Sequence, residues 1–399
     1  MMSVLITGVS TRAAAESAAL AGFEVTALDA FGDLDQHPSV RALSLRRDFG
    51  ARFSAGAAAR AARTVECDAV AYLSSFENHP AAVRTLAAGR TLWGNPPEVL
   101  RRVRDPLLVA RVFRRRGLAT PAVRLARDAA VRDEDALTDG ERRGWLAKPR
   151  ASGGGHGIAP APAAPMAAAG PRRGWYLQER IDGTPASVVF VAAGESAVPL
   201  GISRQLVGEP AFGAEGYRYC GSILAAADDA QLGHDRALLS GARALVAAVA
   251  EELGVVGVNG IDFIARGGVP YPIEVNPRYS ASMELVERAY GVSVFGLHAN
   301  ACGAGVLPAF DLTRARVGAR AVGKAIVFAR HDAVAGNTRE WLGDSTVRDV
   351  PWPGERILRG RPVCTVFAEG RDGAACHAAL VRRAQRIYRQ LAGWEREVA

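Results

Sequence analysis

The chain has 399 residues, of which 49% are hydrophobic and 23% are charged, and its formal net charge is +8. This length and composition are typical of a soluble globular protein with two or three domains. No uninterrupted run of about 18 apolar residues occurs, so the sequence predicts no transmembrane helix and no membrane partner. The first residues lack the regions of a signal peptide, and the five cysteines show no zinc spacing. We therefore expect a cytoplasmic protein with reduced thiols.

Arginine supplies almost all of the positive charge. Of the 49 basic residues, only Lys148 and Lys324 are lysines. The arginines are spread through every predicted helix and form no cluster interleaved with aromatic residues, which argues against a nucleic-acid partner. In a chain this poor in lysine, each lysine suggests a position that needs a compact ammonium group rather than a guanidinium.

Residues 1–97 have the pattern of a doubly wound parallel α/β domain. Strands and helices alternate over residues 3–9, 11–21, 23–28, 51–64 and 69–73. Only Gly8 stands where a dinucleotide-binding turn has three glycines, so an NAD-dependent oxidoreductase is a remote alternative. Glu77 and Asn78 follow the last of these strands, at the end where open α/β sheets bind ligands. They are weak candidates for substrate binding, and loop capping explains them equally well.

A basic helix is expected over residues 98–117, and a strand carrying Lys148 follows a polar stretch at 127–143. This strand leads into a glycine-rich loop made of Ser152, Gly153, Gly154, Gly155, His156 and Gly157. Glycines let the backbone approach a ligand closely, and their N–H groups can hold phosphate while Lys148 adds charge. The loop is not a Walker A motif, because its lysine precedes the glycines. A flexible hairpin remains the alternative interpretation.

The most informative stretch is a predicted β-hairpin over residues 257–278, turned at Gly267-Gly268. A three-residue loop centred on Gly268 would place Asp262 opposite Glu274 and put both on one face with Asn276. A two-residue loop would mix polar and apolar side chains on both faces, so the pattern favours the first register. Opposed carboxylates have Cβ atoms roughly 4.5–5.5 Å apart and repel unless a cation lies between them.

Acidic and amide oxygens without His or Cys are ligands that suit Mg²⁺. Asp262, Glu274 and Asn276 are therefore the candidate metal ligands, although a polar hairpin face directed at water would have the same pattern. Arg278, just past the strand, can meet a phosphate or carboxylate with two hydrogen bonds.

Between and beyond these motifs the pattern predicts strand material at 175–191 and 198–205, a helix at 229–253 and a helix beginning near residue 282. Residues 159–174 form a low-complexity connector. The last 85 residues should contain short strands at 321–328 and 361–368 and a terminal helix from about residue 374.

In this order, the α/β domain, the lysine strand with its glycine loop, Gln178-Glu179-Arg180-Ile181 and Asp-x11-Glu-x-Asn-Pro-Arg resemble the ATP-grasp superfamily. The resemblance covers about residues 1–310. It implies an α/β protein, with α+β character in the grasp part. The expected divisions are an N-terminal Rossmann-like domain at 1–97, an ATP-grasp domain at 98–312 with a small lid at about 118–178, and a C-terminal α+β part at 313–399.

The resemblance also implies roles for individual residues. Lys148 would hold the α- and β-phosphates of ATP, and the 152–157 loop would close over the phosphates. Gln178, Glu179, Arg180 and Ile181 would contact the nucleotide, with Gln178, Glu179 and the Ile181 backbone facing adenine. One or two Mg²⁺ ions, for which Mn²⁺ could substitute, would be held by Asp262, Glu274 and Asn276. Arg278 would stabilise the phosphoryl group during transfer, so that Arg278 and Lys148 are the expected catalytic residues.

Three features depart from the superfamily pattern. Arg104 stands where many relatives have a second phosphate-binding lysine, and Asp182 is only a weak substitute for the ribose-binding acid. The connector at 159–174 suggests an abbreviated lid.

The pattern of residues 8–12 and the run 360–368 resemble a poorly characterised group of predicted carboxylate–amine ligases. The leading hypothesis is therefore a ligase for a small-molecule carboxylate and an amine (or thiol), working through an acyl phosphate and releasing ADP and phosphate. Ser280 and Glu284 are weak substrate candidates after Arg278. The alternatives are a nucleotide-binding regulator without turnover and a biotin-carboxylase-like carboxylase. The oligomeric state stays open, with a homodimer as one option.

Overall fold

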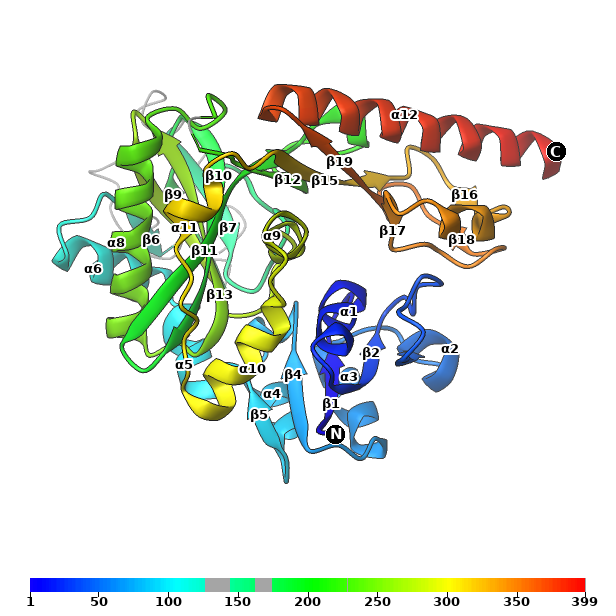
Figure 1. The fold of residues 1–399 in the computed structure, drawn as a ribbon, viewed down its shortest axis with the longest axis horizontal. Coiled ribbons are helices and arrows are strands. Elements are labelled where there is room, and N and C mark those ends of the chain that lie inside the picture. Colours follow the sequence, from blue (N-terminus) through cyan, green and yellow to red (C-terminus); the bar gives the residue numbers. More distant parts are fainter. Residues whose placement is uncertain (126–143, 162–173, 228, 399) are drawn as a thin grey trace, which may run out of the picture.

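Figure 1 shows a computed structural model of the protein, which describes residues 1–125, 144–161, 174–227 and 229–398. A five-stranded parallel sheet forms the N-terminal part, and an eight-stranded antiparallel sheet and a four-stranded sheet follow it. This arrangement confirms the predicted mixed α/β class with a parallel N-terminal domain. Within the described ranges, no helix combines the length and apolar character needed to cross a bilayer.

The N-terminal sheet has the strand order β3-β2-β1-β4-β5, and all neighbouring pairs are parallel. Its strands are β1 (Ser3–Thr7), β2 (Glu24–Asp29), β3 (Val40–Ser44), β4 (Ala69–Tyr72) and β5 (Thr91–Trp93), and its helices are α1 (Arg12–Leu20), α2 (Leu45–Phe49), α3 (Ala55–Ala61) and α4 (Pro80–Ala87). The sequence pattern identified β1, β2 and β4 but missed β3 and β5. Both missed strands lie at the edges of the sheet, where short and partly exposed strands lack the continuous apolar run of a central parallel strand.

The helix predicted over 98–117 is two helices, α5 (Pro97–Val103) and α6 (Pro106–Arg115). Proline lacks an N–H and disfavours helical geometry in the residue before it, so Pro106 ends one helix and begins the next. Asp105 caps α6 by accepting hydrogen bonds from the N–H groups of Leu107 and Leu108. The break leaves Arg104 between the two helices, at the edge of the candidate site.

A small sheet with the order β6-β9-β7-β8, here called the lid, lies at the position predicted for a lid subdomain. Its strands are β6 (Val123–Leu125), β7 (Trp145–Pro149), β8 (Ala159–Pro160) and β9 (Trp175–Glu179). Trp145, Ala147 and Leu177 form its buried core. The polar stretch at 127–143 and, apart from its two ends, the connector at 159–174 lie outside the described residues, so the predicted lid size stays a prediction.

The large sheet has the order β14-β13-β10-β11-β12-β15-β19-β17. Its strands are β10 (Thr184–Ala193), β11 (Ser196–Val207), β12 (Tyr219–Leu224), β13 (Gly257–Arg266), β14 (Val269–Asn276), β15 (Ala321–Phe328), β17 (Val347–Arg348) and β19 (Pro362–Gly370). Helix α8 (Asp235–Leu253) packs on one face, and α9 (Met283–Tyr290) and α10 (Val294–Ala304) pack on the other. The terminal helix α12 (Gly373–Val398) lies along β15 and β19 (Figure 1).

Shorter elements include α11 (Leu312–Arg316), β16 (Ala333–Val334) and β18 (Arg356–Ile357), and a 3₁₀ turn, η2 (Phe76–Asn78), in the loop after β4. Since β15, β17 and β19 continue the same sheet as the preceding strands, the C-terminal part is hydrogen-bonded to the rest of the protein. The predicted domain boundaries at 97 and 312 stay predictions.

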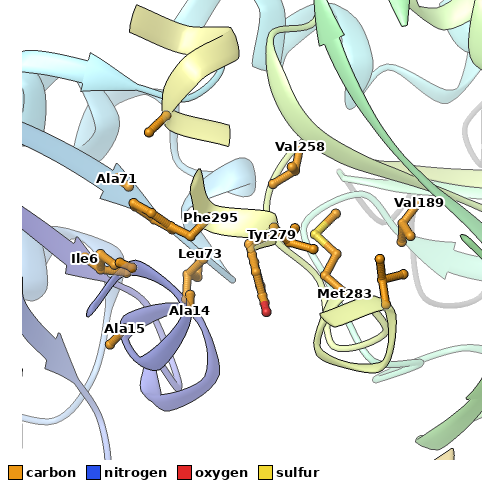
Figure 2. Close-up of a cluster of buried hydrophobic side chains, with 14 of the residues drawn as sticks. Ile6, Ala14, Ala15, Ala71, Leu73, Val189, Val258, Tyr279, Met283 and Phe295 are labelled. Carbon is orange, nitrogen blue, oxygen red and sulfur yellow. The ribbon is translucent and has the colours of Figure 1, made fainter. Parts of the chain in front are cut away.

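One hydrophobic core joins the N-terminal domain to the large sheet (Figure 2). Ile6 lies in β1 and Leu73 directly follows β4, whereas Val189 lies in β10 and Met283 begins α9, and Tyr279 lies between the two groups. Buried apolar contact of this extent fixes the two parts against each other. It therefore sets the loop after β4 opposite the segment that follows β14.

A buried histidine strengthens the same junction. The Nδ1 atom of His298 in α10 accepts a hydrogen bond from the N–H of Val258 at 3.0 Å, and Nε2 lies 3.2 Å from the carbonyl oxygen of Trp93. This pairing requires a neutral ring that carries its proton on Nε2. A Cβ atom at Gly257, where φ is +70°, would lie 2.3 Å from Nδ1, so only glycine fits there.

Candidate active site

The register of the β13–β14 hairpin places the predicted metal ligands together. Asp262 pairs with Glu274, as expected, and Gly260 pairs with Asn276. The predicted three-residue loop is wrong, because Arg266 pairs with Val269 and the turn holds only the two glycines. Both glycines have positive φ, which a two-residue hairpin turn of this kind requires. A β-bulge at Ile273 inserts the extra residue that restores the polar face.

The two carboxylates of this face differ in their electrostatic surroundings. Burial and the neighbouring Glu274 carboxylate raise the pKa of Asp262 to about 7. Asp262 accepts hydrogen bonds from Gln205 at 2.9 Å and from Asn276 at 3.0 Å. Burial alone would raise the pKa of Glu274, but the charges of Arg104 and Lys148 outweigh it and lower that pKa. The positive charge near this face is therefore too small for both carboxylates to ionise easily. A bound cation would supply the missing positive charge.

The composition of this face limits the kind of cation it could hold. Within the described ranges, no three His, Cys, Asp or Glu side chains gather in a metal-binding group. A cation here would rely on two carboxylates and the amide of Asn276, and this all-oxygen set fits Mg²⁺ or Mn²⁺.

Lys148 lies on β7 and faces the hairpin through Gln178 of β9. Its Nζ donates to Oε1 of Gln178 at 3.0 Å, and Nε2 of Gln178 donates to the carbonyl oxygen of Ile273 at 3.3 Å. Ile273 is the bulged residue, so the bulge also connects the lid to the hairpin. Lys148 is 6% exposed, and with Gln178, Ile273 and Glu274 it lines one pocket between the lid and the hairpin.

The glycine-rich loop sits against the segment that leads into β12. Tyr219 donates its N–H to the carbonyl oxygen of Gly154 at 3.1 Å. A Cβ atom at Gly155 would lie 1.8 Å from the carbonyl oxygen of Tyr217, and φ at this residue is +79°. Glycine is therefore required at this position both for its conformation and for close backbone approach. Ser152 and Gly153 line the same pocket as Lys148, whereas the His156 side chain is exposed.

Arg104 connects the hairpin to the glycine-rich loop. Its Nη1 lies 2.5 Å from Glu274, and its Nη2 donates to the carbonyl oxygens of Arg150 and Ser152 at 3.3 and 3.1 Å. Its Nε is buried and makes no hydrogen bond. Arg104 therefore occupies the place where the resemblance leads us to expect a lysine, and it contacts both structures that would surround a phosphate.

Arg278 and the loop after β4 meet beside this pocket. Arg278 Nε lies 2.8 Å from a carboxylate oxygen of Glu77, and Arg278 Nη2 donates to Asn276 at 3.2 Å. Asn78 donates to the carbonyl oxygen of Ser152 at a long 3.5 Å. Glu77 is 1% exposed, and one buried oxygen each of Glu77 and Asn78 finds no hydrogen-bond partner among the described residues. The two substrate candidates of the N-terminal domain therefore lie next to Arg278 and the glycine-rich loop.

Glu284 lies in a different environment from the one we expected. It is paired with Arg12 and Lys324, each at 2.6 Å, and is 4% exposed. Burial alone would raise the pKa of Glu284, but these two cations hold it well below its usual range. Ser280, the other candidate after Arg278, makes only a 3.4 Å contact with Ser282 through its hydroxyl.

The predicted adenine-contacting segment is only partly beside the pocket. Gln178 lines it, whereas Glu179, Arg180 and Ile181 do not. Glu179 accepts a hydrogen bond from the N–H of Ala122 at 2.9 Å, and Arg180 pairs with Asp182 at 3.0 Å in an exposed position. Asp182 therefore already has a partner, and the nucleotide contacts of these residues stay predictions.

Two polar residues were missed from the sequence, one at the site and one in the buried network around Glu284. Gln205 bonds to Asp262, and its alternation with Ser203 on a predicted strand is the signal that could have identified a polar face. Arg12 is completely buried and also pairs with Asp349 at 2.7 Å, a contact spanning most of the chain. No local pattern in one sequence reveals such a contact.

Comparisons with known proteins agree with this architecture. Residues 103–282 match the family model of the ATP-grasp domain. No curated protein matches the chain by sequence. Among solved structures, an L-amino acid ligase from Bacillus licheniformis has a TM-score of 0.67 at 18% identity, over 97% of both chains.

Two further solved structures share the fold. N5-carboxyaminoimidazole ribonucleotide synthetase from Thermotoga maritima has a TM-score of 0.65 at 16% identity, over 96% of this chain and 98% of its own. Biotin carboxylase from Campylobacter jejuni has a TM-score of 0.69 at 14% identity, over 95% of this chain and 89% of its own. Identities this low establish a shared fold and no more. The family match identifies an ATP-grasp domain over residues 103–282, and the solved structures show that the fold extends over nearly the whole chain.

Proposed function

We propose that the protein is an ATP-dependent ligase that joins a small-molecule carboxylate to an amine through an acyl phosphate. The observation that carries this proposal is the convergence of Lys148, Arg104 and Glu274 on one pocket, with Arg278 beside it. Phosphoryl transfer depends mainly on positioning and charge neutralisation, and these side chains provide both.

The cation implied by this proposal is Mg²⁺ or Mn²⁺. Asp262, Glu274 and Asn276 would hold it, and the raised pKa of Asp262 supports the view that this face needs more positive charge. When bound, the cation would neutralise phosphate charge. Lys148 and Arg104 would add charge to the same phosphates from the lid side and from the α5–α6 break.

The proposed chemistry has two steps. A carboxylate oxygen of the substrate attacks the γ-phosphorus of ATP, the bond to the β-phosphate oxygen breaks, and ADP leaves. The amine nitrogen then attacks the acyl carbon, the carbon–oxygen bond to phosphate breaks, and phosphate leaves as the amine loses a proton. Arg278 would stabilise the transferred phosphoryl group, since its guanidinium already lies 3.2 Å from Asn276 at the metal face.

The loop after β4 provides candidates for substrate recognition. Glu77 and Asn78 have buried oxygens without hydrogen-bond partners, and such groups gain most from a polar ligand. Because one structural neighbour is an L-amino acid ligase, amino acids belong among the first substrates to test, as both acid and amine. The biotin carboxylase neighbour makes bicarbonate a necessary member of the same panel.

The direct test measures ADP formation with ATP, Mg²⁺ and a panel of carboxylates and amines. We expect ADP release that depends on one carboxylate and falls at least a hundredfold in Glu274→Gln, with the exposed Glu195→Gln as the matched control. Nucleotide binding without carboxylate-dependent ADP release would support a regulator instead. A protein whose melting temperature does not respond to ATP and Mg²⁺ would contradict the proposal at its first step.

A further inference from the structure

A second recess lies among the loop between β11 and β12, the end of β15 and the turn before β19. Its volume is about 820 Å³, within the usual range for small-molecule sites. Its walls are Pro210, Gly213, Ala214, Glu215, Arg218, Ala329, Arg330, Arg359 and Gly360. None of these residues lines the pocket around Lys148, so the two spaces are separate.

Two of the three arginines in this recess are fixed by their surroundings. The guanidinium of Arg218 lies 4.9 Å from the ring centre of Phe328 and donates to the carbonyl oxygen of Gly360 at 2.9 Å. Arg330 lies 3.9 Å from the ring centre of Tyr388 and donates to the carbonyl oxygen of Pro210 at 3.2 Å. Stacking and carbonyl hydrogen bonds orient both groups without neutralising them, which lowers the entropy lost when a ligand binds.

The recess carries uncompensated positive charge. Among the described residues, Arg218, Arg330 and Arg359 have no ion pair, and Glu215 is the acid that lines the recess. The nearby Asp332 already accepts from the side chain of Arg356 and from the backbone N–H of Arg359. Arginines that serve only to keep a surface solvated do not require guanidinium groups held in fixed positions around one recess.

We propose that this recess binds an oxyanion, a phosphate or carboxylate group carried by a small molecule. Guanidinium groups bind such oxyanions with paired hydrogen bonds, and three arginines line this recess. The site would adjoin the nucleotide pocket without overlapping it, since Arg218 stands between Tyr217 and Tyr219, which contact the glycine-rich loop.

Calorimetric titration tests this site with inorganic tripolyphosphate and with citrate at fixed ionic strength. Lys148→Met forms the background, because it weakens anion binding in the nucleotide pocket. We expect saturable binding of at least one anion, weakened at least tenfold when Arg359→Gln or Arg218→Gln is added. Arg359 is exposed and its side chain makes no ion pair in the described structure, so its replacement leaves the fold intact. Tighter binding of tripolyphosphate would identify a phosphate group as the ligand, and tighter binding of citrate a carboxylate group.

The exposed Arg236→Gln removes the same charge outside the recess and serves as the matched control. If Arg359→Gln and Arg236→Gln weaken binding equally, the effect is a general charge effect and the proposal is wrong. The absence of saturable binding by either anion also overturns it. If Lys148→Met does not fold, the comparison is repeated with the wild-type protein, which should bind the anion both in the nucleotide pocket and in the recess. Arg359→Gln must then weaken the binding in the recess at least tenfold.

Discussion

Arg104 contacts both the hairpin and the chain around the glycine-rich loop. Its guanidinium reaches Glu274 and two loop carbonyls at once, which the compact ammonium of lysine cannot do. In the structure it supplies much of the positive charge that lowers the pKa of Glu274. We therefore assign Arg104 to phosphate binding in the proposed mechanism.

We predict that Arg104→Met weakens ATP binding about tenfold or more, since one charge–phosphate contact is worth more than 1 kcal/mol. Arg104→Lys should restore part of the affinity, because it keeps the charge but not the link to the loop. Isothermal titration with a non-hydrolysable nucleotide measures both. Arg101→Met, on the exposed side of α5, is the control. Equal affinity in Arg104→Met and the control would exclude this role.

Replacing Asp262 should change the stability of the protein and its affinity for a divalent cation in opposite directions. At pH 8 the metal-free protein holds two ionised carboxylates close together, so Asp262→Asn should raise the free energy of unfolding by about 1 kcal/mol. The same substitution removes a ligand, and Mn²⁺ binding followed by electron paramagnetic resonance should weaken at least tenfold. Unchanged Mn²⁺ affinity would show that this face does not hold the cation.

At the scale of elements, the glycine-rich loop depends on its fit against the segment before β12. Gly154 and Gly155 both have positive φ, but only at Gly155 would a Cβ atom collide with backbone. Gly155→Ala should therefore weaken nucleotide binding at least tenfold, whereas Gly154→Ala should have the smaller effect of local strain, about 1 kcal/mol. Nucleotide titration compares the two variants directly. Equal losses would mean that the contact with Tyr217 does not position the loop.

Because α10 contains the buried His298, the stability of the junction between the domains should depend on pH. Burial lowers the pKa of His298 to about 4, so the folded protein holds a neutral ring that the unfolded chain would protonate below about pH 6.5. Stability should therefore decrease as pH falls from about 6.5 to 4, by up to about 3 kcal/mol from this group. Urea unfolding across this range measures the slope.

The His298→Gln variant isolates that contribution from those of other buried groups. Glu287, whose pKa burial raises to about 7, acts in the opposite direction because it favours the protonated folded state at low pH. The variant should be less stable than the wild type at pH 7, and the difference should shrink toward pH 4. A difference that does not change with pH would contradict the assignment.

The β13–β14 hairpin shows which features could be predicted from the sequence and which could not. Alternation of polar and apolar residues identified the pairing of Asp262 with Glu274, because only that register keeps the faces separate. The same pattern could not distinguish a three-residue loop from a two-residue turn with a bulge, since both give this pairing. The carbonyl oxygen of the bulged Ile273 accepts a hydrogen bond from Gln178, which lies 95 residues away in the chain, and the hairpin's own sequence carries no signal of this contact.

At the scale of the whole molecule, most central strands were predicted, although β12 in the large sheet was missed. The connections between domains were not predictable. Buried strands such as β1 and β4 have nearly continuous apolar runs, whereas edge strands β3 and β5 do not. The ion pairs of Arg12 with Glu284 and Asp349 join three distant segments of the chain, and local patterns contain no information about them. For the same reason, the sequence singled out Glu284 as a substrate candidate although it lies in this buried network.

The arrangement of domains also explains why the candidate site is composite. The hydrophobic core in Figure 2 holds the loop after β4 against Arg278, and the lid contributes Lys148 across the pocket. Catalysis by such a site should therefore require all three parts. Removing the Glu77 carboxylate with Glu77→Gln should raise the KM for the carboxylate or amine at least tenfold while the affinity for nucleotide stays within about twofold. A loss of nucleotide affinity alone would place Glu77 outside the substrate site.

The central claim is that a carboxylate is activated as an acyl phosphate, and oxygen transfer tests it most directly. The protein is incubated with ATP, Mg²⁺, an amine and a carboxylate labelled with ¹⁸O, and the released phosphate is analysed by ³¹P NMR. An acyl phosphate passes one carboxylate oxygen to phosphate, so we predict labelled phosphate from the wild type and none from Glu274→Gln. Phosphate that is released without label, at a rate independent of the carboxylate, would contradict the account.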